Sequence, residues 1–134
     1  MDFFKSKATE IKKTILIVDD EEDFCHFVKL NLEKTGNFEV LTANNGADGI
    51  SMANRYQPDL ILLDIIMPNT TGTQVAETLR NNDATKDIPI IFVTAIVKRG
   101  EVGAKDYRFG GNYFLFKPVK LDELLHEIGD KLAK

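Results

Sequence analysis

The feature that most constrains the fold is a regular alternation of short apolar runs with longer segments whose apolar residues recur at helical spacing. Short apolar runs bounded by polar or turn-forming residues are typical of strands. The runs are "TILIV" (14–18), "FEVLT" (38–42), "DLILL" (59–63), "IPIIFV" (88–93) and "YFLF" (113–116). Because parallel strands need crossover helices, the alternation predicts a parallel α/β sheet covered by helices on both faces.

Helices are expected between these strands and after the last one. Phe24, Val28 and Leu32 step by four residues, and this pattern stops at Gly36, a natural helix terminator. Helical spacing also occurs at Ala47, Ile50, Ala53 and Tyr56, at Val75 and Leu79, and at Leu121, Leu124, Leu125, Ile128 and Leu132. The stretch "KRGEVGAKDYRF" (98–109) is the weakest, because its two glycines lower helix propensity, so we expect a short or mobile fourth helix there.

Length and composition predict one globular domain. The chain has 134 residues, of which 43% are hydrophobic and 28% charged, which is an ordinary globular balance. We expect an N-terminal extension at 1–13 and a single domain at 14–134. The chain has neither an apolar run long enough to span a bilayer nor a signal peptide pattern, which predicts a cytoplasmic protein that does not contact membranes.

Charge and cysteine content narrow the function further. The 17 basic and 21 acidic side chains give a net charge of −4, which argues against direct binding of nucleic acid. The single cysteine, Cys25, excludes an internal disulfide. Since Cys25 lies in an apolar helical pattern, we interpret it as a packing residue instead of a reactive thiol.

Polar residues follow four of the predicted strands directly. Asp19 and Asp20 end the first strand, Asp64 the third, Thr94 the fourth and Lys117 the fifth. Ligands of an open parallel sheet bind beyond the carboxyl ends of its strands, so these side chains should converge at one edge. Three carboxylates suit Mg²⁺, a cation that prefers oxygen ligands. With that charge neutralised, one carboxylate is able to attack phosphorus and form an aspartyl phosphate, while Thr94 offers a hydroxyl donor.

A simpler interpretation exists for most of these residues when each is taken alone. Asp19 and Asp20 fit as N-caps of the first helix. Thr94 fits as an ordinary strand-end residue and Lys117 as a solvated loop lysine. Asp64 is harder to explain in this way, because it places a charge between two apolar runs. The five together favour a site, since coincidence would have to place every polar exception on the same edge.

Other polar residues nearby are not expected to bind a ligand or take part in catalysis. Glu21, Glu22 and Asp23 are expected to be solvated acids in the first turn of a helix, favoured by its dipole, and not ligands. His26 and His126 lie in helical patterns without metal-ligand spacing.

Four segments resemble, in order and at compatible spacing, the receiver domain of two-component response regulators. They are "ILIVDDEED", "PDLILLDIIMPNTTG", "IPIIFVTA" and "GGNYFLFKPV". The resemblance covers about residues 14 to 132, nearly the whole chain. It implies a flavodoxin-like (βα)5 doubly wound parallel sheet with strand order 2-1-3-4-5, in a single-domain protein similar to the chemotaxis regulators.

The resemblance also implies roles for the acidic residues. Asp64, ahead of "IIMP", matches the phosphoacceptor. Asp20 matches the direct Mg²⁺ ligand, with Asp19 assisting through water or a second contact. Asp64 and the backbone carbonyl of Ile66 complete the implied metal ligands.

A further set of residues matches the family's switch and phosphoryl-binding positions. Thr94 matches the switch hydroxyl, Phe114 the aromatic switch, and Lys117 the phosphoryl-binding lysine. The Lys117–Pro118 bond is similar to the cis peptide of the family. Thr71 stands where the family usually has Asp, a departure that affects the start of the third helix and not the phosphate.

The implied function is a phosphorelay module that is regulatory and catalyses only its own phosphorylation and dephosphorylation. A sensor histidine kinase or phosphotransfer protein would donate a phosphoryl group to Asp64 with Mg²⁺ bound. A downstream protein would then read the surface formed by the fourth helix, fifth strand and fifth helix. The sequence leaves open a homodimer, and whether this receiver stands alone or belongs to a longer regulator or hybrid kinase.

Two other functions compete with this one. A small phosphatase or phosphotransferase would use Asp64 as a turnover nucleophile, but it commonly needs a second acid or base nearby, which "DIIMP" does not supply. Flavin binding would use the same topology, but no phosphate-binding loop follows the first strand, and the acids there would repel phosphate in the absence of metal.

Overall fold

A computed structural model describes residues 11–95, 108–109 and 112–133. Its main sheet contains five parallel strands in the order β2-β1-β3-β6-β8, with β7 added antiparallel at the β8 edge. The strands are β1 (Lys13–Val18), β2 (Phe38–Ala43), β3 (Leu60–Leu63), β6 (Ile90–Ala95), β7 (Arg108–Phe109) and β8 (Asn112–Lys117). The five parallel strands, numbered along the chain, have the predicted order 2-1-3-4-5.

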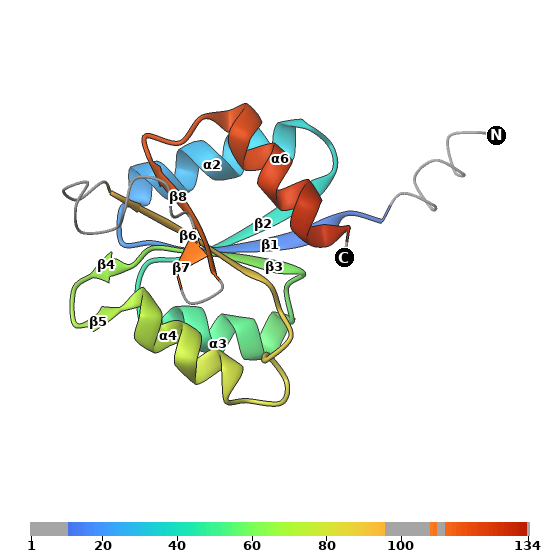
Figure 1. The fold of residues 1–134 in the computed structure, drawn as a ribbon. Helices are drawn as coiled ribbons and strands as arrows, with labels where there is room; N and C mark the ends of the chain where they lie inside the picture. The colour runs from blue at the N-terminus through green and yellow to red at the C-terminus, as the bar shows by residue number, and fades with distance from the viewer. Residues whose placement is uncertain (1–10, 96–107, 110–111, 134) are drawn as a thin grey trace.

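Helices cover both faces of this sheet, as the alternation of patterns predicted (Figure 1). Helices α2 (Glu22–Lys34) and α6 (Leu121–Leu132) lie on one face, and α3 (Gly46–Tyr56) and α4 (Gly72–Arg80) on the other. Of the stretch in which a fourth helix was expected, residues 98–107 lie outside the described part of the chain. Its last two residues form β7, an edge strand that the sequence pattern did not predict.

The central strands are buried on both faces because their side chains alternate between two hydrophobic cores. Ile15 and Ile17 of β1 belong to the core beneath α2 and α6, whereas Leu16 and Val18 belong to the core beneath α3 and α4. Every residue of β3 is buried, which explains why its sequence is continuously apolar. The two cores fix the sheet, and so they fix the positions at which its strands end.

The segment after β3 forms a small ribbon that leads into α4. Strands β4 (Ile66–Met67) and β5 (Thr70–Thr71) pair antiparallel, and α4 begins immediately afterwards. Thr71 is the N-cap of α4: its hydroxyl accepts a hydrogen bond from the Gln74 N–H at 3.2 Å, and the Gln74 side chain accepts one from the Thr71 N–H at 3.2 Å. The threonine that departs from the pattern of the resembled family therefore forms a complete capping box with Gln74.

Gly72 lets this helix start directly behind Asp64. A Cβ atom at position 72 would lie 2.2 Å from the backbone oxygen of Asp64, closer than any side chain tolerates. The Gly72 N–H donates to the Ile65 carbonyl at 2.8 Å. The backbone on either side of Asp64 is thus packed against the first residue of α4.

Among the described helices, none has the length and apolar character needed to cross a membrane.

Candidate functional site

The structure brings together the acidic residues that follow β1 and β3. Asp19, Asp20 and Asp64 each offer a carboxylate oxygen, and these oxygens lie within 4.8 Å of one another. Lys117, the last residue of β8, places its ammonium beside Asp19 and Asp64. Because the strands are parallel, their carboxyl ends meet at one edge of the sheet, as the sequence predicted.

Asp19 is buried but well supplied with partners. Its side chain is 1% exposed, and its Oδ1 accepts a hydrogen bond from the Glu21 N–H at 2.9 Å. Its Oδ2 lies 2.8 Å from the Lys117 ammonium. Burial raises the pKa of Asp19, and both partners oppose that rise by favouring the charged form. Asp19 and Asp20 were alternatively expected to cap the first helix, but Glu21 is the N-cap of α2 and caps it without a side-chain hydrogen bond.

Asp64 is also buried, but its carboxylate has no close hydrogen-bond or ion-pair partner among the described residues. Its exposed fraction is 4%, the Ile66 N–H donates to its Oδ1 at a long 3.4 Å, and the Lys117 ammonium lies 3.9 Å from its Oδ2. Burial, followed by the nearby charge of Asp19, raises the pKa of Asp64 to about 6. A carboxylate in this condition gains from any cation or hydrogen-bond donor that reaches it.

Lys117 supplies positive charge to the site, and its ammonium lies closer to Asp19 than to Asp64. Its ammonium contacts Asp19 and the carboxylate of Glu21, and lies 4.4 Å from the centre of the Phe24 ring. Burial opposes the charged form of Lys117, but the contacts with Asp19 and Glu21 outweigh it and raise the pKa of the lysine. The Lys117–Pro118 peptide bond is cis, as the sequence resemblance predicted.

Asp20 and Ile66 form the solvent side of the site. Asp20 is exposed, and Ile66, the first residue of β4, has an exposed fraction of 58%. The structure places the Ile66 N–H toward Asp64 through the long hydrogen bond already described. The metal-binding role expected for its backbone carbonyl stays a prediction.

The two expected switch residues are both buried. Thr94 lies in β6 with an exposed fraction of 4%, and its hydroxyl has no hydrogen-bond partner within the described part of the chain. Phe114 in β8 is 5% exposed and stacks on Phe92 and Phe116, with ring centroids 5.1 Å and 6.5 Å apart. A buried hydroxyl without a partner is costly, so Thr94 is suited to donate to a group that arrives nearby.

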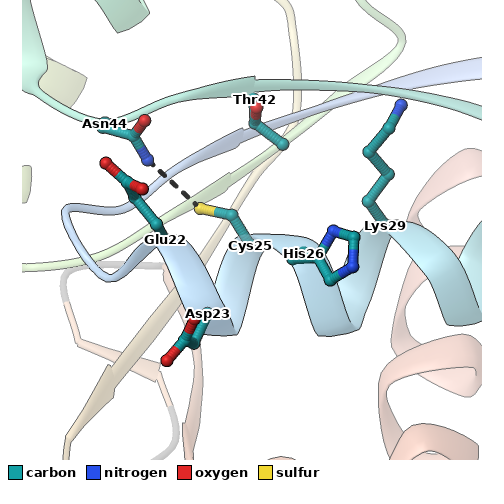
Figure 2. Close-up of a pocket in the computed structure, with 7 residues that line it drawn as sticks. All are labelled: Glu22, Asp23, Cys25, His26, Lys29, Thr42 and Asn44. Atoms are coloured by element: carbon teal, nitrogen blue, oxygen red, sulfur yellow. Dashed lines mark hydrogen bonds between the residues drawn. The ribbon is translucent and has the colours of Figure 1, made fainter.

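A second layer of residues holds the backbone of Asp19. The Asn44 side chain donates to the Asp19 carbonyl at 3.0 Å, and the Cys25 thiol approaches the same oxygen at 3.4 Å. These two side chains help to line a pocket of about 550 Å³. Figure 2 shows its lining residues, which are Glu22, Asp23, Cys25, His26, Lys29, Thr42 and Asn44. Burial raises the pKa of Cys25 to about 12, so the thiol stays protonated and serves as packing, as the sequence indicated.

Two contributors to the site were not recognised in the sequence. Glu21 was expected to be only a solvated helix-start acid; it is exposed, but its carboxylate also contacts Lys117. Asn44 was not singled out at all. Its position directly after β2, whose end lies beside that of β1, was the available signal.

Comparison with known proteins decides the family. The model of the response regulator receiver domain matches residues 15–129. The chain belongs to this family. The chain is 39% identical to the protein PilH of Pseudomonas aeruginosa over 120 residues, covering 89% of this chain and 97% of PilH. It is 31% identical to the polar-differentiation response regulator DivK of Brucella anthropi over 122 residues, covering 90% of this chain and 97% of DivK.

Solved structures and longer relatives agree with this assignment. The chemotaxis protein CheY4 of Vibrio cholerae superimposes with a TM-score of 0.77 at 26% identity, covering 90% of this chain and 98% of that one. The chain also spans about half the length of some relatives: it is 36% identical to the transcriptional regulator RpaA of Synechocystis, covering 85% of this chain and 46% of RpaA.

Membership of the family establishes a role in phosphorylation-based signalling. Receiver domains are regulatory modules that bind Mg²⁺ at an acidic pocket and interact with histidine kinases or phosphotransfer proteins and with downstream targets. The competing prediction of a small phosphatase or phosphotransferase is not favoured by this result.

Proposed function

We propose that Asp64 accepts a phosphoryl group from the phosphohistidine of a sensor histidine kinase or phosphotransfer protein, in a Mg²⁺-dependent reaction. The observation that carries this proposal is the condition of the Asp64 carboxylate. It is almost completely buried, has only a long hydrogen bond, and lies within 4.8 Å of two further carboxylates. A nucleophile of this kind needs a cation before it can act, and its surroundings are built to attract one.

Asp19, Asp20 and Asp64 would together hold the magnesium ion, with the Ile66 carbonyl as a further oxygen ligand. The donor set fits, because all three side chains offer hard oxygen atoms and their clustered charge is only partly offset by one lysine. Bound there, the ion would neutralise the carboxylates and favour negative charge on a transferring phosphoryl group. The exposed Asp20 leaves this side of the site open to a donor.

The residues of the chain then have separate tasks in the transfer. An Asp64 carboxylate oxygen forms the new bond to phosphorus, while the phosphorus–nitrogen bond of the phosphohistidine breaks and the imidazole nitrogen keeps the electron pair. The Lys117 ammonium, 3.9 Å from Asp64, pairs with an oxygen of the incoming group. Gly72, packed against the backbone of Asp64, holds the nucleophile in place.

Phosphorylation then changes a protein-binding surface. The added charge of roughly −1.5 to −2 attracts the Thr94 hydroxyl. This hydroxyl breaks no hydrogen bond with the described residues when it moves. Phe114 lies on the neighbouring strand within the aromatic stack, so a shift of β6 changes the population of its buried rotamer. The surface expected for the downstream protein was that of the fourth helix, fifth strand and fifth helix. We place this protein on a surface that includes β8 and α6, whereas the stretch expected to form the fourth helix lies mostly outside the described residues.

Phosphoryl incorporation tests this proposal directly. The full chain is incubated with acetyl phosphate and Mg²⁺, and its intact mass is measured. We expect a gain of one phosphoryl group in the wild type and in the control Asp83→Asn, whose carboxylate is exposed and lies between α4 and the amino end of β6, outside the acidic cluster. Asp64→Asn, or wild type with a chelator, should gain none. Phosphoryl uptake by Asp64→Asn would refute the assignment.

A further inference from the structure

The Lys117 ammonium is held on one side of the site by residues between the end of β1 and the first turn of α2. It lies 2.8 Å from Asp19 and contacts the Glu21 carboxylate, but it is 3.9 Å from Asp64. The Phe24 ring lies beneath it, with the ammonium 4.4 Å from the ring centre. The lysine expected to serve the phosphoryl group is therefore drawn away from the residue that would carry that group.

The Glu21 side chain is able to make this contact because it forms no other hydrogen bond or ion pair with the described residues. Glu21 occupies the N-cap position of α2 without a side-chain cap hydrogen bond, so its carboxylate can extend toward Lys117. Glu21 is also exposed, and together with Glu22, Asp23 and Phe24 it lines an open recess of about 360 Å³. A contact with an exposed carboxylate is weak and easily exchanged, whereas the contact with buried Asp19 is not.

We propose that Glu21 is a positioning residue that holds the Lys117 ammonium at the Asp19 side of the site until a phosphoryl group reaches Asp64. This inference rests on the proposed function, because it takes Asp64 as the acceptor. The phosphoryl group brings more negative charge than Glu21 carries, and it lies in a less solvated place. Lys117 then exchanges the Glu21 carboxylate for a phosphoryl oxygen and keeps Asp19.

The neighbouring residue Glu22 offers a matched control. Glu22→Gln removes the same charge from the same end of α2. Glu22 lines the recess that it shares with Glu21 and also the pocket beside Cys25 (Figure 2), but within the described part of the chain the Lys117 ammonium pairs with Glu21 and not with Glu22. Glu21→Gln keeps the side-chain length and cannot remove a cap hydrogen bond, since there is none. Any effect of net charge on Mg²⁺ or on an anionic donor appears in both variants. An effect of the Lys117 contact appears only in Glu21→Gln.

The first measurement follows the Lys117 ammonium itself and does not depend on activity. Lysine ammonium signals are recorded by ¹H–¹⁵N NMR on the full chain, and the Lys117 signal is assigned from its loss in Lys117→Arg. Adding Mg²⁺ and beryllium fluoride, a mimic of the phosphoryl group, should shift the wild-type signal. Without these additions, Glu21→Gln should already move the signal part of the way toward that position, and Glu22→Gln should leave it in place.

The second measurement is the rate of phosphorylation at subsaturating acetyl phosphate with Mg²⁺. We expect Glu21→Gln to react about two- to five-fold faster than Glu22→Gln, the range given by the loss of one exposed carboxylate contact. Equal rates and equal Lys117 signals in the two variants would overturn the role of Glu21 and leave Asp64 as the acceptor. If the wild type takes up no phosphoryl group, the proposed function itself fails, and the role of Glu21 fails with it.

Discussion

Asp19 at the end of β1 and Asp64 at the end of β3 occupy similar positions but have different partners. Each backbone N–H continues the sheet by donating to a neighbouring strand at 2.9 Å, and each side chain is almost fully buried. Asp19 has a close lysine and a backbone N–H, whereas Asp64 has the same lysine at 3.9 Å and a long hydrogen bond. The protein therefore compensates one buried carboxylate and leaves the other in need of a partner.

This difference shows how two residues of the same type, on adjacent strands, can divide structural and chemical tasks. A compensated carboxylate stays charged and fixed, which suits a ligand that helps to hold a cation. An uncompensated carboxylate is costly for the folded state but gains from an arriving metal ion or phosphoryl group. We attribute the reactivity proposed for Asp64 to this cost, and the two hydrophobic cores on either side of the sheet stabilise the fold that bears it.

The largest change in stability is expected from a substitution that displaces the backbone of Asp64. Gly72→Ala would place a Cβ atom 2.2 Å from the Asp64 backbone oxygen, so the start of α4 and the end of β3 must separate. We expect a loss of about 3 kcal/mol in the free energy of unfolding, measured by urea denaturation, because backbone atoms cannot relax as a side chain does. Gly129→Ala is the control, since a Cβ atom there meets nothing within 4 Å and should stabilise α6 by about 0.5–1 kcal/mol. Equal stability of the two variants would contradict the packing described.

A smaller effect is expected from removing the charge of each carboxylate in turn. In the presence of a chelator at pH 7, Asp64→Asn should raise the free energy of unfolding by about 2 kcal/mol, because it removes a buried charge that lacks close partners. Asp19→Asn should give the smaller gain, or a loss, since Lys117 and the Glu21 N–H compensate that charge. A larger gain for Asp19→Asn than for Asp64→Asn would reverse the comparison.

An effect no larger than this gain is expected from pH, and its sign follows from the raised pKa of Asp64. In the folded state the pKa of Asp64 is about 6, whereas the ordinary pKa of an aspartate is 3.8. Asp64 therefore keeps its proton up to a higher pH in the folded state than in the unfolded state. Between these values the folded state holds more protons than the unfolded state, so the contribution of Asp64 to stability falls as pH rises. In chelator, the stability gained by Asp64→Asn should therefore shrink as the pH is lowered from 7 toward 4, as urea titrations at each pH would show. A gain that stays constant over this range would show that the pKa is not raised.

The sequence predicted the fold and the convergence of the acids because both depend on simple regularities. Apolar runs and helical spacing determine where strands end, and the strand ends carry Asp19, Asp20, Asp64 and Lys117. The sequence could not assign partners among these groups. Lys117 contacts Glu21 across 96 positions of the chain, and that choice depends on side-chain reach once the sheet has formed. The two-residue strand β7 was missed because so short a segment carries no periodicity.

The most direct test asks which carboxylate carries the phosphoryl group. The full chain is phosphorylated with acetyl phosphate and Mg²⁺ and then reduced with borohydride, which converts an aspartyl phosphate to homoserine, and peptide masses locate the change. We expect homoserine at position 64 and intact aspartates at positions 19 and 20. Homoserine at position 19 or 20, or no conversion of a phosphorylated chain at position 64, would contradict it.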